Sequence, residues 1–486
     1  MFRAWITLAV VLVSTVSQAQ LAPNIVLILA DDMGWKDVGY HGSEINTPHI
    51  DRLATEGLRL DRFYTQPTCS PTRAALLTGN SSLALGVTGP LSKINPTGLP
   101  LNQRLLPEYL KEQHYQTALV GKWHLGYLQK AYGPRARGFD HFYGHLTGGI
   151  GYWDHVHGGG LDWQRNGKTL REDGYSTHLL RDEAIKVITE RDKTKPLFLY
   201  ASFNAPHLPN EAPEASIKRY AHLPDKNRQV HAAMVEELDA AIGSIVETLQ
   251  QEGILDNTLI WFMSDNGGLN LSSYSGSGVV TLANWVDDWF DPGEAPFTIL
   301  EFIRVNVLEG AADNTPLRKG KQSIYEGGVR VPSFVYWQGR LQPSELQQMI
   351  TVQDVTPTLL AAAGLQLADQ NFEGANHWPY LSGESKAIDR DRPYIIVSTD
   401  GEAVYRFPWK LLKLSSGETE LYNLQQDPVE AVNLTEQFPD TVAKLQKDLE
   451  SAVRGESIHI PIYKAIMNMD FFGGEETLPP WAEQVN

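Results

Sequence analysis

The sequence feature that most constrains the fold is a set of continuous apolar runs separated by helical patterns. The runs are rich in β-branched and aromatic residues and span residues 25–30, 117–120, 197–203 and 258–263. A strand buried on both faces has such a run, whereas a strand with one solvated face alternates apolar and polar residues. Between the runs, apolar side chains recur every three to four residues, at 105–113, 179–191 and 230–249. This alternation predicts an α/β fold in which helices sandwich a large mixed, mostly parallel sheet.

The pattern changes near residue 386, which predicts a second, smaller unit. Short strand-like segments joined by turn residues follow at 394–398, 404–407, 411–414 and 421–424, before a helical pattern at 440–453. We therefore expect a larger unit over residues 20–385 and a C-terminal α+β subdomain with an antiparallel sheet over 386–486. Residues 269–314 begin with a stretch rich in Gly and Ser and continue with an apolar stretch. We interpret them as an insertion into the larger unit.

The first 19 residues have the pattern of a signal peptide. Arg3 precedes a short apolar stretch at residues 6–13, and a small-x-small pattern at 17–19 precedes Gln20. A membrane anchor is the alternative, but the stretch is shorter than the roughly 20 apolar residues that span a bilayer. We therefore expect an exported protein, periplasmic or secreted, with no membrane span after cleavage.

Polar side chains follow each of the four apolar runs. They are Asp31, Asp32, Lys122, His124, His207, Asp265 and Asn266. A single Asp after a strand is commonly an ordinary turn residue, but four strand ends of the same character make that interpretation weaker. In open α/β sheets ligands bind beyond the carboxyl ends of the strands, so we expect these side chains to meet at one edge. Carboxylate and amide oxygens are ligands that Ca²⁺ prefers, and the sequence has no His/Cys set at zinc spacing.

The only cysteine is Cys69, which begins the sequence CSPTRAALLTG at residues 69–79. A single cysteine excludes an intramolecular disulfide. Pro71 suits the first position of a helix with Ser70 as its N-cap, which would put Cys69 just before a helix N-terminus. The residues alone leave three possibilities: a buried structural cysteine, a thiolate nucleophile, or the precursor of a modified residue.

The cysteine motif resembles the signature of the type I sulfatases of the alkaline phosphatase superfamily, Cys-x-Pro-x-Arg followed after four residues by Thr-Gly. Further similar segments occur in order at residues 24–34, 121–126, 205–209, 264–268, 316–328, 354–364 and 420–433. Within that family the sequence is most similar to the arylsulfatase B branch, the N-acetylgalactosamine-4-sulfatases, at residues 31–42, 64–67, 121–126 and 316–328. It departs from the vertebrate members in lacking disulfides and in carrying the 269–314 insertion.

The resemblance implies a modified nucleophile and a metal ion. Cys69 would be converted to formylglycine by a formylglycine-generating or an anaerobic sulfatase-maturating enzyme. One hydroxyl of the hydrated aldehyde would attack sulfur, and the other would later expel the sulfate. One Ca²⁺ per active site would be held by Asp31, Asp32, residue 69, Asp265 and Asn266.

The resemblance also assigns the proton transfers. Asp265 would assist the attack as a base, and His124 would deprotonate the second hydroxyl. His207, together with Lys321, would protonate the leaving oxygen. Residue chemistry alone leaves Lys319 as an equal candidate, and only the resemblance, counted five residues back from the Glu-Gly-Gly at 326–328, favours Lys321.

Three cations complete the set that the resemblance implies. Arg73 and Lys122 would fix residue 69, and Lys122 and Lys321 would stabilise the sulfate charge and bind substrate with His207. The formal net charge of −17 argues against a nucleic-acid binder. It does not argue against a sulfated substrate, because the implied pocket is locally positive.

A Gly-rich segment at residues 144–163 is predicted to contact the substrate. Aromatic faces stack on sugar rings, and imidazoles can hydrogen-bond hydroxyls or sulfates. The residues of this segment that we assign to substrate are His145, Trp153, His155 and His157, with Trp163 beside them. Trp285 and Trp289 of the insertion are weaker candidates. Ordinary packing within a structured loop is the alternative for all of them.

Together these features predict a sulfatase that hydrolyses the 4-O-sulfate of galactose or N-acetylgalactosamine units. The substrate would be a sulfated oligo- or polysaccharide, either a carrageenan-type galactan or a glycosaminoglycan. Two alternatives remain at this point: a phosphodiesterase or phosphonate hydrolase of the same superfamily, and a non-catalytic binder of sulfated glycans.

Overall fold

The computed structural model describes residues 22–157, 160–274, 278–290, 298–367, 371–388, 390–460 and 481–482. The signal peptide expected at residues 1–19 lies outside this range. Among the described residues, no helix combines the length and the apolar character needed to cross a membrane.

The central sheet has ten strands. Their bounds are β1 Asn24–Ala30, β2 Leu58–Leu60, β4 Gln116–Lys122, β5 His141–His145, β8 Gln164–Arg165, β9 Lys168–Thr169, β10 Leu197–Ser202, β11 Thr258–Ser264, β12 Ser333–Tyr336 and β13 Ser344–Leu346. The order is β13-β2-β12-β11-β1-β10-β4-β5-β8-β9. The central strands β11-β1-β10-β4-β5 run parallel, whereas β12, β8 and β9 pair antiparallel with their neighbours. This mixed, mostly parallel sheet confirms the predicted fold class.

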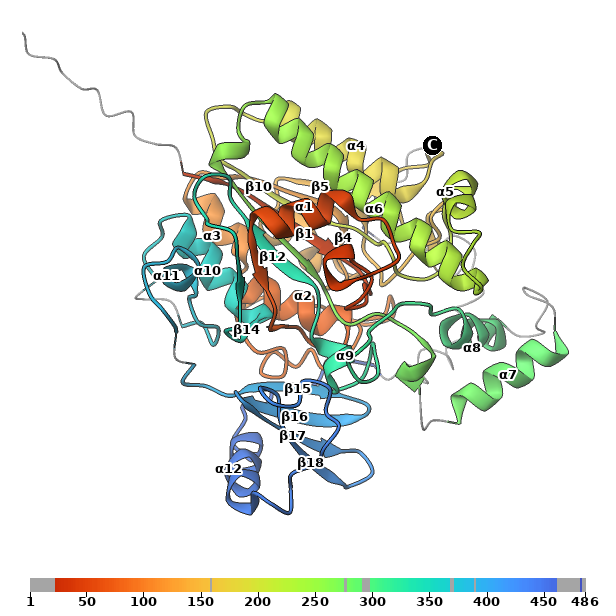
Figure 1. Ribbon diagram of the computed structural model, residues 1–486. Coiled ribbons are helices and arrows are strands. Elements are labelled where there is room, and N and C mark those ends of the chain that lie inside the picture. Colours follow the sequence, from red (N-terminus) through yellow and green to blue (C-terminus); the bar gives the residue numbers. More distant parts are fainter. Residues whose placement is uncertain are drawn as a thin grey trace, which may run out of the picture.

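Helices cover both faces of the sheet (Figure 1). On one face lie α1 (Pro48–Glu56), α4 (Ser176–Thr189) and α6 (Lys226–Gln251), and on the other α2 (Cys69–Thr78), α3 (Leu106–Glu112) and α10 (Val355–Ala362). Alternate residues of β1 enter the two layers: Val26 and Ile28 pack into one cluster, and Ile25 and Leu27 into the other. Because both faces of β1 are covered, its sequence is apolar throughout.

Strand β4 illustrates how the sheet positions polar residues. The predicted segment 117–120 extends to Lys122 because Gly121 lets the chain continue close beside β10. Gly121 has φ +116°, and a Cβ there would lie 1.8 Å from the carbonyl oxygen of Ser202. Only glycine fits such an approach, and it brings Lys122 to the carboxyl end of the sheet.

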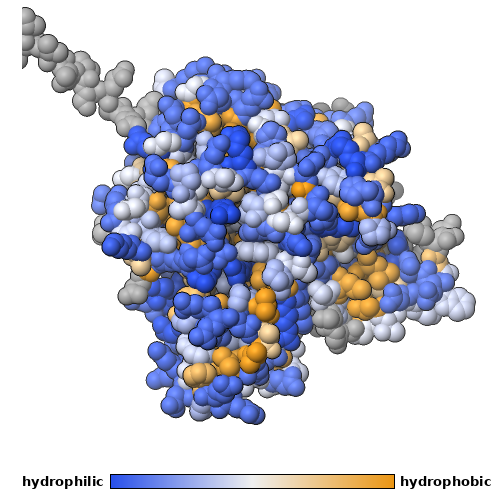
Figure 2. Space-filling view, viewed as in Figure 1, coloured by the Kyte–Doolittle hydropathy of each residue, from blue (hydrophilic) through white to orange (hydrophobic). Residues whose placement is uncertain are grey.

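The 269–314 segment folds largely as a helical hairpin. Its elements are the short η5 (Leu271–Tyr274), α7 (Val279–Trp289) and α8 (Thr298–Leu308). The two helices project from the side of the molecule in Figure 1, and Figure 2 shows apolar side chains exposed over this part. On α7, Ala283 and Val286 are buried, whereas Trp285 and Trp289 are 47% and 70% exposed.

A four-stranded antiparallel sheet lies beneath the large unit in Figure 1. Its strands are β15 (Tyr394–Ser398), β16 (Gly401–Arg406), β17 (Trp409–Leu414) and β18 (Thr419–Asn423). Helix α12 (Pro439–Glu450) covers one face of this sheet, and the other face packs on the segment that ends in α9 (Glu326–Val329). The predicted antiparallel sheet is confirmed, while the boundary near residue 386 stays a prediction.

Further short elements connect these layers. They include β3 (Phe63–Tyr64), β6 (Val156–His157), β7 (Gly160–Leu161), β14 (Ile350–Thr351), α5 (Glu214–Arg219) and α11 (Trp378–Leu381). After α12 the chain returns to the larger unit, where Gly455 N donates to the Leu83 carbonyl (2.9 Å) and Ile458 N to the Gly86 carbonyl (2.9 Å).

Candidate active site

The carboxyl ends of the central strands bring the predicted polar residues together. Asp31 and Asp32 follow β1, Lys122 ends β4, and Asp265 follows β11; all four are buried. Lys122 Nζ lies 2.6 Å from Asp31 Oδ2. The backbone N–H of Asp32 donates to Asp265 Oδ1 at 3.2 Å. Adjacent strands therefore supply carboxylates and cations to one small volume, as expected for a site at the carboxyl edge of a parallel sheet.

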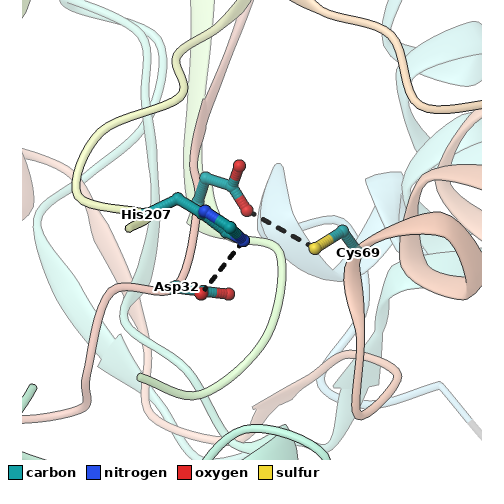
Figure 3. A group of neighbouring side chains, drawn as sticks. Asp32, Cys69 and His207 are labelled. Carbon is teal, nitrogen blue, oxygen red and sulfur yellow. Dashed lines mark hydrogen bonds and ion pairs between the residues drawn. The ribbon is translucent and has the colours of Figure 1, made fainter. Parts of the chain in front are cut away.

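Cys69 is the first residue of α2, a helix whose ten residues are all buried. Its Sγ lies 3.5 Å from Asp31 Oδ1, and Figure 3 shows Cys69, Asp32 and His207 facing one another. Burial raises the pKa of the Cys69 thiol to about 12 despite the nearby Lys122 and Lys321. An unmodified Cys69 is therefore protonated at neutral pH, and a thiol is a poor nucleophile.

The predicted capping role of Ser70 is wrong. The helix begins at Cys69, its N-cap is Thr68, and no side chain caps it. Ser70 Oγ instead donates to the His124 carbonyl (2.9 Å) and accepts from Leu91 N (3.0 Å). Because Ser70 is fully buried, its hydroxyl takes tertiary partners that no local pattern predicts.

Arg73 is fully buried, one turn along α2, and its guanidinium group binds other residues of the site. Its Nε and Nη2 donate to Asp265 Oδ2 at 3.1 and 2.9 Å, and its Nη1 donates to the Lys122 carbonyl at 3.0 Å. The Nη1 group also donates to Ser202 Oγ at 2.6 Å. Ser202, at the end of β10, escaped the sequence reasoning because a lone Ser at a strand end carries no distinctive signal.

The structure distinguishes the two candidate lysines. Lys321 Nζ lies 2.7 Å from Asp32 Oδ2 and 3.1 Å from His207 Nε2. Lys319 Nζ instead pairs with Asp400 Oδ2 at 3.2 Å, in the C-terminal sheet. Lys321 is therefore the lysine of this site.

The charges in the site shift its ionisable groups. Burial, and then the neighbouring Asp31, raise the pKa of Asp265 to about 6. Burial acts in the same direction on Asp32, but Lys321 and His207 outweigh it and hold its pKa at about 2. Burial, reinforced by Lys321, lowers the pKa of His207 to about 3. The imidazole of His207 is thus neutral at pH 7, and its Nε2 accepts a hydrogen bond from the adjacent ammonium group of Lys321.

The donor set fits a divalent cation. One ligand atom from each of Asp31, Asp32, Cys69 and His207 lies within 4.8 Å of the others. Asn266 Oδ1 is buried with no hydrogen-bond partner in the described part of the chain, while its Nδ2 donates to Asp32 Oδ1 at 2.7 Å. A buried unpaired oxygen beside two carboxylates is suited to a hard cation.

For two residues, the surroundings differ from those expected of the predicted metal ligands. Asp265 is not one of the four residues of this group, and its Oδ2 accepts hydrogen bonds from Arg73. His207 lies inside that group, although the sequence assigned it to proton transfer.

The Gly-rich segment crosses directly over the site histidines. A Cβ on Gly149 would lie 2.9 Å from His207 Nδ1, and a Cβ on Gly148 would lie 2.8 Å from His124 Cε1. Burial and the cations nearby hold the pKa of His124 well below its usual range. These two glycines, which the sequence marked only as part of a Gly-rich loop, let the backbone cover the catalytic edge.

The predicted substrate residues of this loop separate into two environments. His155 is buried and stacks on Trp163, with ring centroids 4.5 Å apart, and His157 Nδ1 lies 2.5 Å from the Gly149 carbonyl oxygen. Trp153 is 49% exposed and packs against Tyr175. His155 and Trp163 therefore pack against each other inside the protein, whereas the ring of Trp153 is exposed.

His145 is unusual among the loop residues. It is fully buried at the end of β5, and neither of its ring nitrogens has a hydrogen-bond partner among the described residues. Burial, with Lys122 and Arg73 nearby, lowers its pKa well below the usual value, so the ring is neutral.

Sequence profiles place the chain in a known family. The profile described as Sulfatase matches residues 23–365, and that described as N-sulphoglucosamine sulphohydrolase, C-terminal, matches residues 319–456. The chain belongs to the sulfatase family, as its cysteine motif predicted. It is a sulfuric ester hydrolase. This assignment favours hydrolysis of a sulfate ester over the three alternatives: a phosphodiesterase, a phosphonate hydrolase and a non-catalytic binder of sulfated glycans.

Similar proteins agree with this assignment. Arylsulfatase J of Mus musculus is 31% identical over 486 residues, covering 88% of this chain and 75% of the relative. N-acetylgalactosamine-6-sulfatase of Homo sapiens is 32% identical over 398 residues, covering 77% and 68%. The crystal structure of Ps i-CgsB in complex with k-i-k-neocarrahexaose superposes with a TM-score of 0.78 at 29% identity, covering 92% of this chain and 97% of that one. The special similarity to 4-sulfatases stays a prediction.

Proposed function

We propose that this sulfatase removes the 4-O-sulfate from galactose or N-acetylgalactosamine units of a sulfated galactan or glycosaminoglycan, after conversion of Cys69 to formylglycine. The observation that carries the proposal is the position of Cys69, in its signature motif, at the buried start of α2 facing Asp31 and Asp32. The similarity to an N-acetylgalactosamine sulfatase and to a protein complexed with a carrageenan hexaose supports a sugar of galacto configuration.

The proposal includes one Ca²⁺ held by the hard oxygen donors of the site. Asp31, Asp32 and Asn266 would hold it, with Asp265 and the oxygen of the modified residue 69. When bound, the cation supplies positive charge that offsets the crowded carboxylates and attracts the oxygens of a sulfate group. The hydrated aldehyde of residue 69 supplies two hydroxyls, one for attack on sulfur and one for release of sulfate.

The protein's own residues then handle protons. Asp265, a carboxylate at the edge of the site, is suited to accept the proton of the attacking hydroxyl. His207 and Lys321 are suited to protonate the leaving sugar oxygen as a pair, in which the Lys321 ammonium group carries the proton and donates to His207 Nε2. His124 is a neutral imidazole under the Gly148 backbone and is suited to take the proton of the second hydroxyl.

The buried cations provide the electrostatic part of catalysis. Arg73 makes four hydrogen bonds: two to Asp265, one to the end of β4 at Lys122 and one to the end of β10 at Ser202. Lys122 and Lys321 each carry an ammonium group beside a carboxylate, from which it can also contact the sulfate oxygens. Positive groups fixed in a water-poor site stabilise charge that develops in the transition state.

A screen of defined oligosaccharides tests the substrate. Galacto-configured oligosaccharides carrying a single sulfate at position 4 or at position 6 are incubated with the matured enzyme, and free sulfate is measured. We expect release from the 4-sulfated series and none from Cys69→Ala. Release from the 6-sulfated series alone would contradict the proposed position, and unchanged release by Cys69→Ala would contradict the nucleophile.

Mass spectrometry of the peptide that contains residue 69 tests the modification. We expect the mass of formylglycine in protein produced together with a maturating enzyme, and the mass of cysteine without one. An active protein whose residue 69 is wholly cysteine would contradict this part of the proposal.

We also propose export through cleavage of residues 1–19. N-terminal sequencing of the exported protein is expected to begin at Gln20. A membrane fraction that retains Met1 would instead support an anchor.

A further inference from the structure

The segment that carries Lys321 is held in a conformation it would not adopt alone. Lys319 and Gln322 both have left-handed backbones, with φ +62° and +72°. Such conformations are costly for residues other than glycine and persist where the surroundings fix them. The backbone is held by Lys321 N donating to the Gly268 carbonyl (3.0 Å) and Gln322 N donating to the Pro67 carbonyl (2.8 Å).

The C-terminal sheet binds this segment just before Lys321. Arg318 Nη1 donates to the hydroxyl of Tyr422 at 3.0 Å, and Lys319 Nζ pairs with Asp400 at 3.2 Å. Lys321 alone turns the other way, toward Asp32. The catalytic lysine is thus preceded by side chains anchored in a different sheet.

A buried charge cluster provides the third anchor. Lys410 of β17 lies 3.1 Å from Glu326 Oε1 and 2.6 Å from Glu430 Oε1, and all three side chains are buried. Glu430 Oε2 accepts from the Glu326 backbone N–H at 2.8 Å, and the hydroxyl of Tyr64 donates to Glu326 Oε2 at 2.8 Å. Glu326 is the first residue of α9, five residues after Lys321, at the junction of the two sheets (Figure 1).

We propose that Lys410, Glu326 and Glu430 form a charge cluster by which the C-terminal sheet positions Lys321, a role that rests on the proposed function of Lys321 at the leaving oxygen. One ammonium group between two buried carboxylates is costly to desolvate, so it adds little stability compared with apolar packing. Its geometry does fix the start of α9 from two directions. Loss of the ammonium group leaves two carboxylates in mutual repulsion and displaces the segment toward solvent.

The cluster acts most strongly on one step of the reaction. Displacing Lys321 Nζ from His207 Nε2 weakens protonation of the leaving oxygen, and it weakens the contact with the sulfate oxygens equally for every sulfate ester. A misplacement of about 1 Å in a catalytic group can lower a rate about 100-fold. The loss therefore depends on the leaving group: a sugar alkoxide needs the proton, and a nitrophenolate does not.

The test compares two substrates in the matured full-length enzyme. These are a 4-O-sulfated galactose disaccharide and 4-nitrophenyl sulfate, and the variants are Lys410→Met, Glu430→Gln and the control Lys413→Met. Lys413 is an exposed lysine on the same strand as Lys410. For Lys410→Met we expect kcat to fall about 30-fold on the disaccharide and at most about threefold on the aryl sulfate, with KM within about twofold. The control should match the wild type on both.

Near-UV circular dichroism separates positioning from folding. If Lys410→Met does not fold, Glu430→Gln gives the same test, since it keeps the side-chain shape and should lose about fivefold on the disaccharide alone. Equal losses on the two substrates, wild-type kcat in a folded Lys410→Met, or unfolding of both variants would overturn the positioning role. Absence of sulfate release by the wild type would overturn the proposed function, and this role with it.

Discussion

At the scale of single residues, the site is a cluster of buried charged groups whose donor atoms suit a divalent cation. Asn266 shows this most directly. Its Nδ2 is bonded to Asp32, and its Oδ1 is buried with no hydrogen-bond partner in the described part of the chain. The residue type and its place after β11 could be predicted from the sequence. The unpaired oxygen could not, because it depends on which atoms of three separate strands face one another.

Replacement of Asn266 by Ala is expected to weaken Ca²⁺ binding at least about tenfold, because it removes one oxygen ligand and the hydrogen bond that orients Asp32. Isothermal titration of the chelator-treated protein with Ca²⁺ measures the change. Asn102→Ala, at an exposed position, serves as the control and should bind like the wild type. Equal affinity in Asn266→Ala would exclude Asn266 as a ligand.

At the scale of elements, close contacts between strands and helices determine the positions of the functional groups. Gly121 in β4 has no room for a side chain, since its Cβ would meet the Ser202 carbonyl. We expect Gly121→Ala to lower the free energy of unfolding by about 3 kcal/mol, from strain and from displacement of β10. Urea denaturation measures it. Gly278→Ala, where a Cβ meets open space, should change stability by less than about 0.5 kcal/mol; similar losses in the two variants would refute this account.

A second element-scale prediction concerns acid stability. Glu183 of α4 binds His141 Nε2 of β5 at 2.8 Å and Arg165 Nε of β8 at 3.0 Å, joining the helix to the sheet edge. Burial would raise the pKa of Glu183, but His141 and Arg165 outweigh it and lower the pKa from 4.5 to about 2. The folded-state pKa lies below the unfolded value, so this stabilisation is present above about pH 4.5 and is lost as the pH falls through about 2.

Glu183→Gln should therefore cost about 1–2 kcal/mol at pH 7, after allowance for solvent around Arg165. The difference from the wild type should shrink as the pH approaches 2. Urea midpoints at pH 7, 4 and 3 measure it. A difference that is constant across this range would show that charge plays no part.

At the scale of the whole molecule, the two sheets depend on each other. The face of the small sheet that is not covered by α12 packs on Tyr64, Ile324, Tyr325 and Val329 of the larger unit. The chain after α12 also returns to residues 83–86, close to the loop whose Leu91 N binds Ser70. The boundary near residue 386 is thus not a division into independent parts.

Residues 20–385 produced alone are expected to be aggregation-prone and to release no sulfate, because this apolar face would be exposed and Glu326 would lose Lys410. Size-exclusion chromatography, near-UV circular dichroism and sulfate release compare the fragment with the full chain. A monomeric, folded and active fragment would show that the small sheet is dispensable.

The sequence by itself determined the sheet, its helical layers and the residues at its carboxyl edge. Those depend on patterns of burial along β1, β4, β10 and β11, and on a cysteine motif whose residues are contiguous. The resemblance favoured Lys321 over Lys319, and the tertiary structure showed the two side chains facing different partners, Asp32 and Asp400. Only the tertiary structure moved Ser70 from a helix cap to a tertiary hydrogen bond and placed Lys410 behind the segment that carries Lys321. The physical reason is that burial periodicity is a local property of the chain, whereas the direction of a buried side chain is set by partners tens to hundreds of residues away.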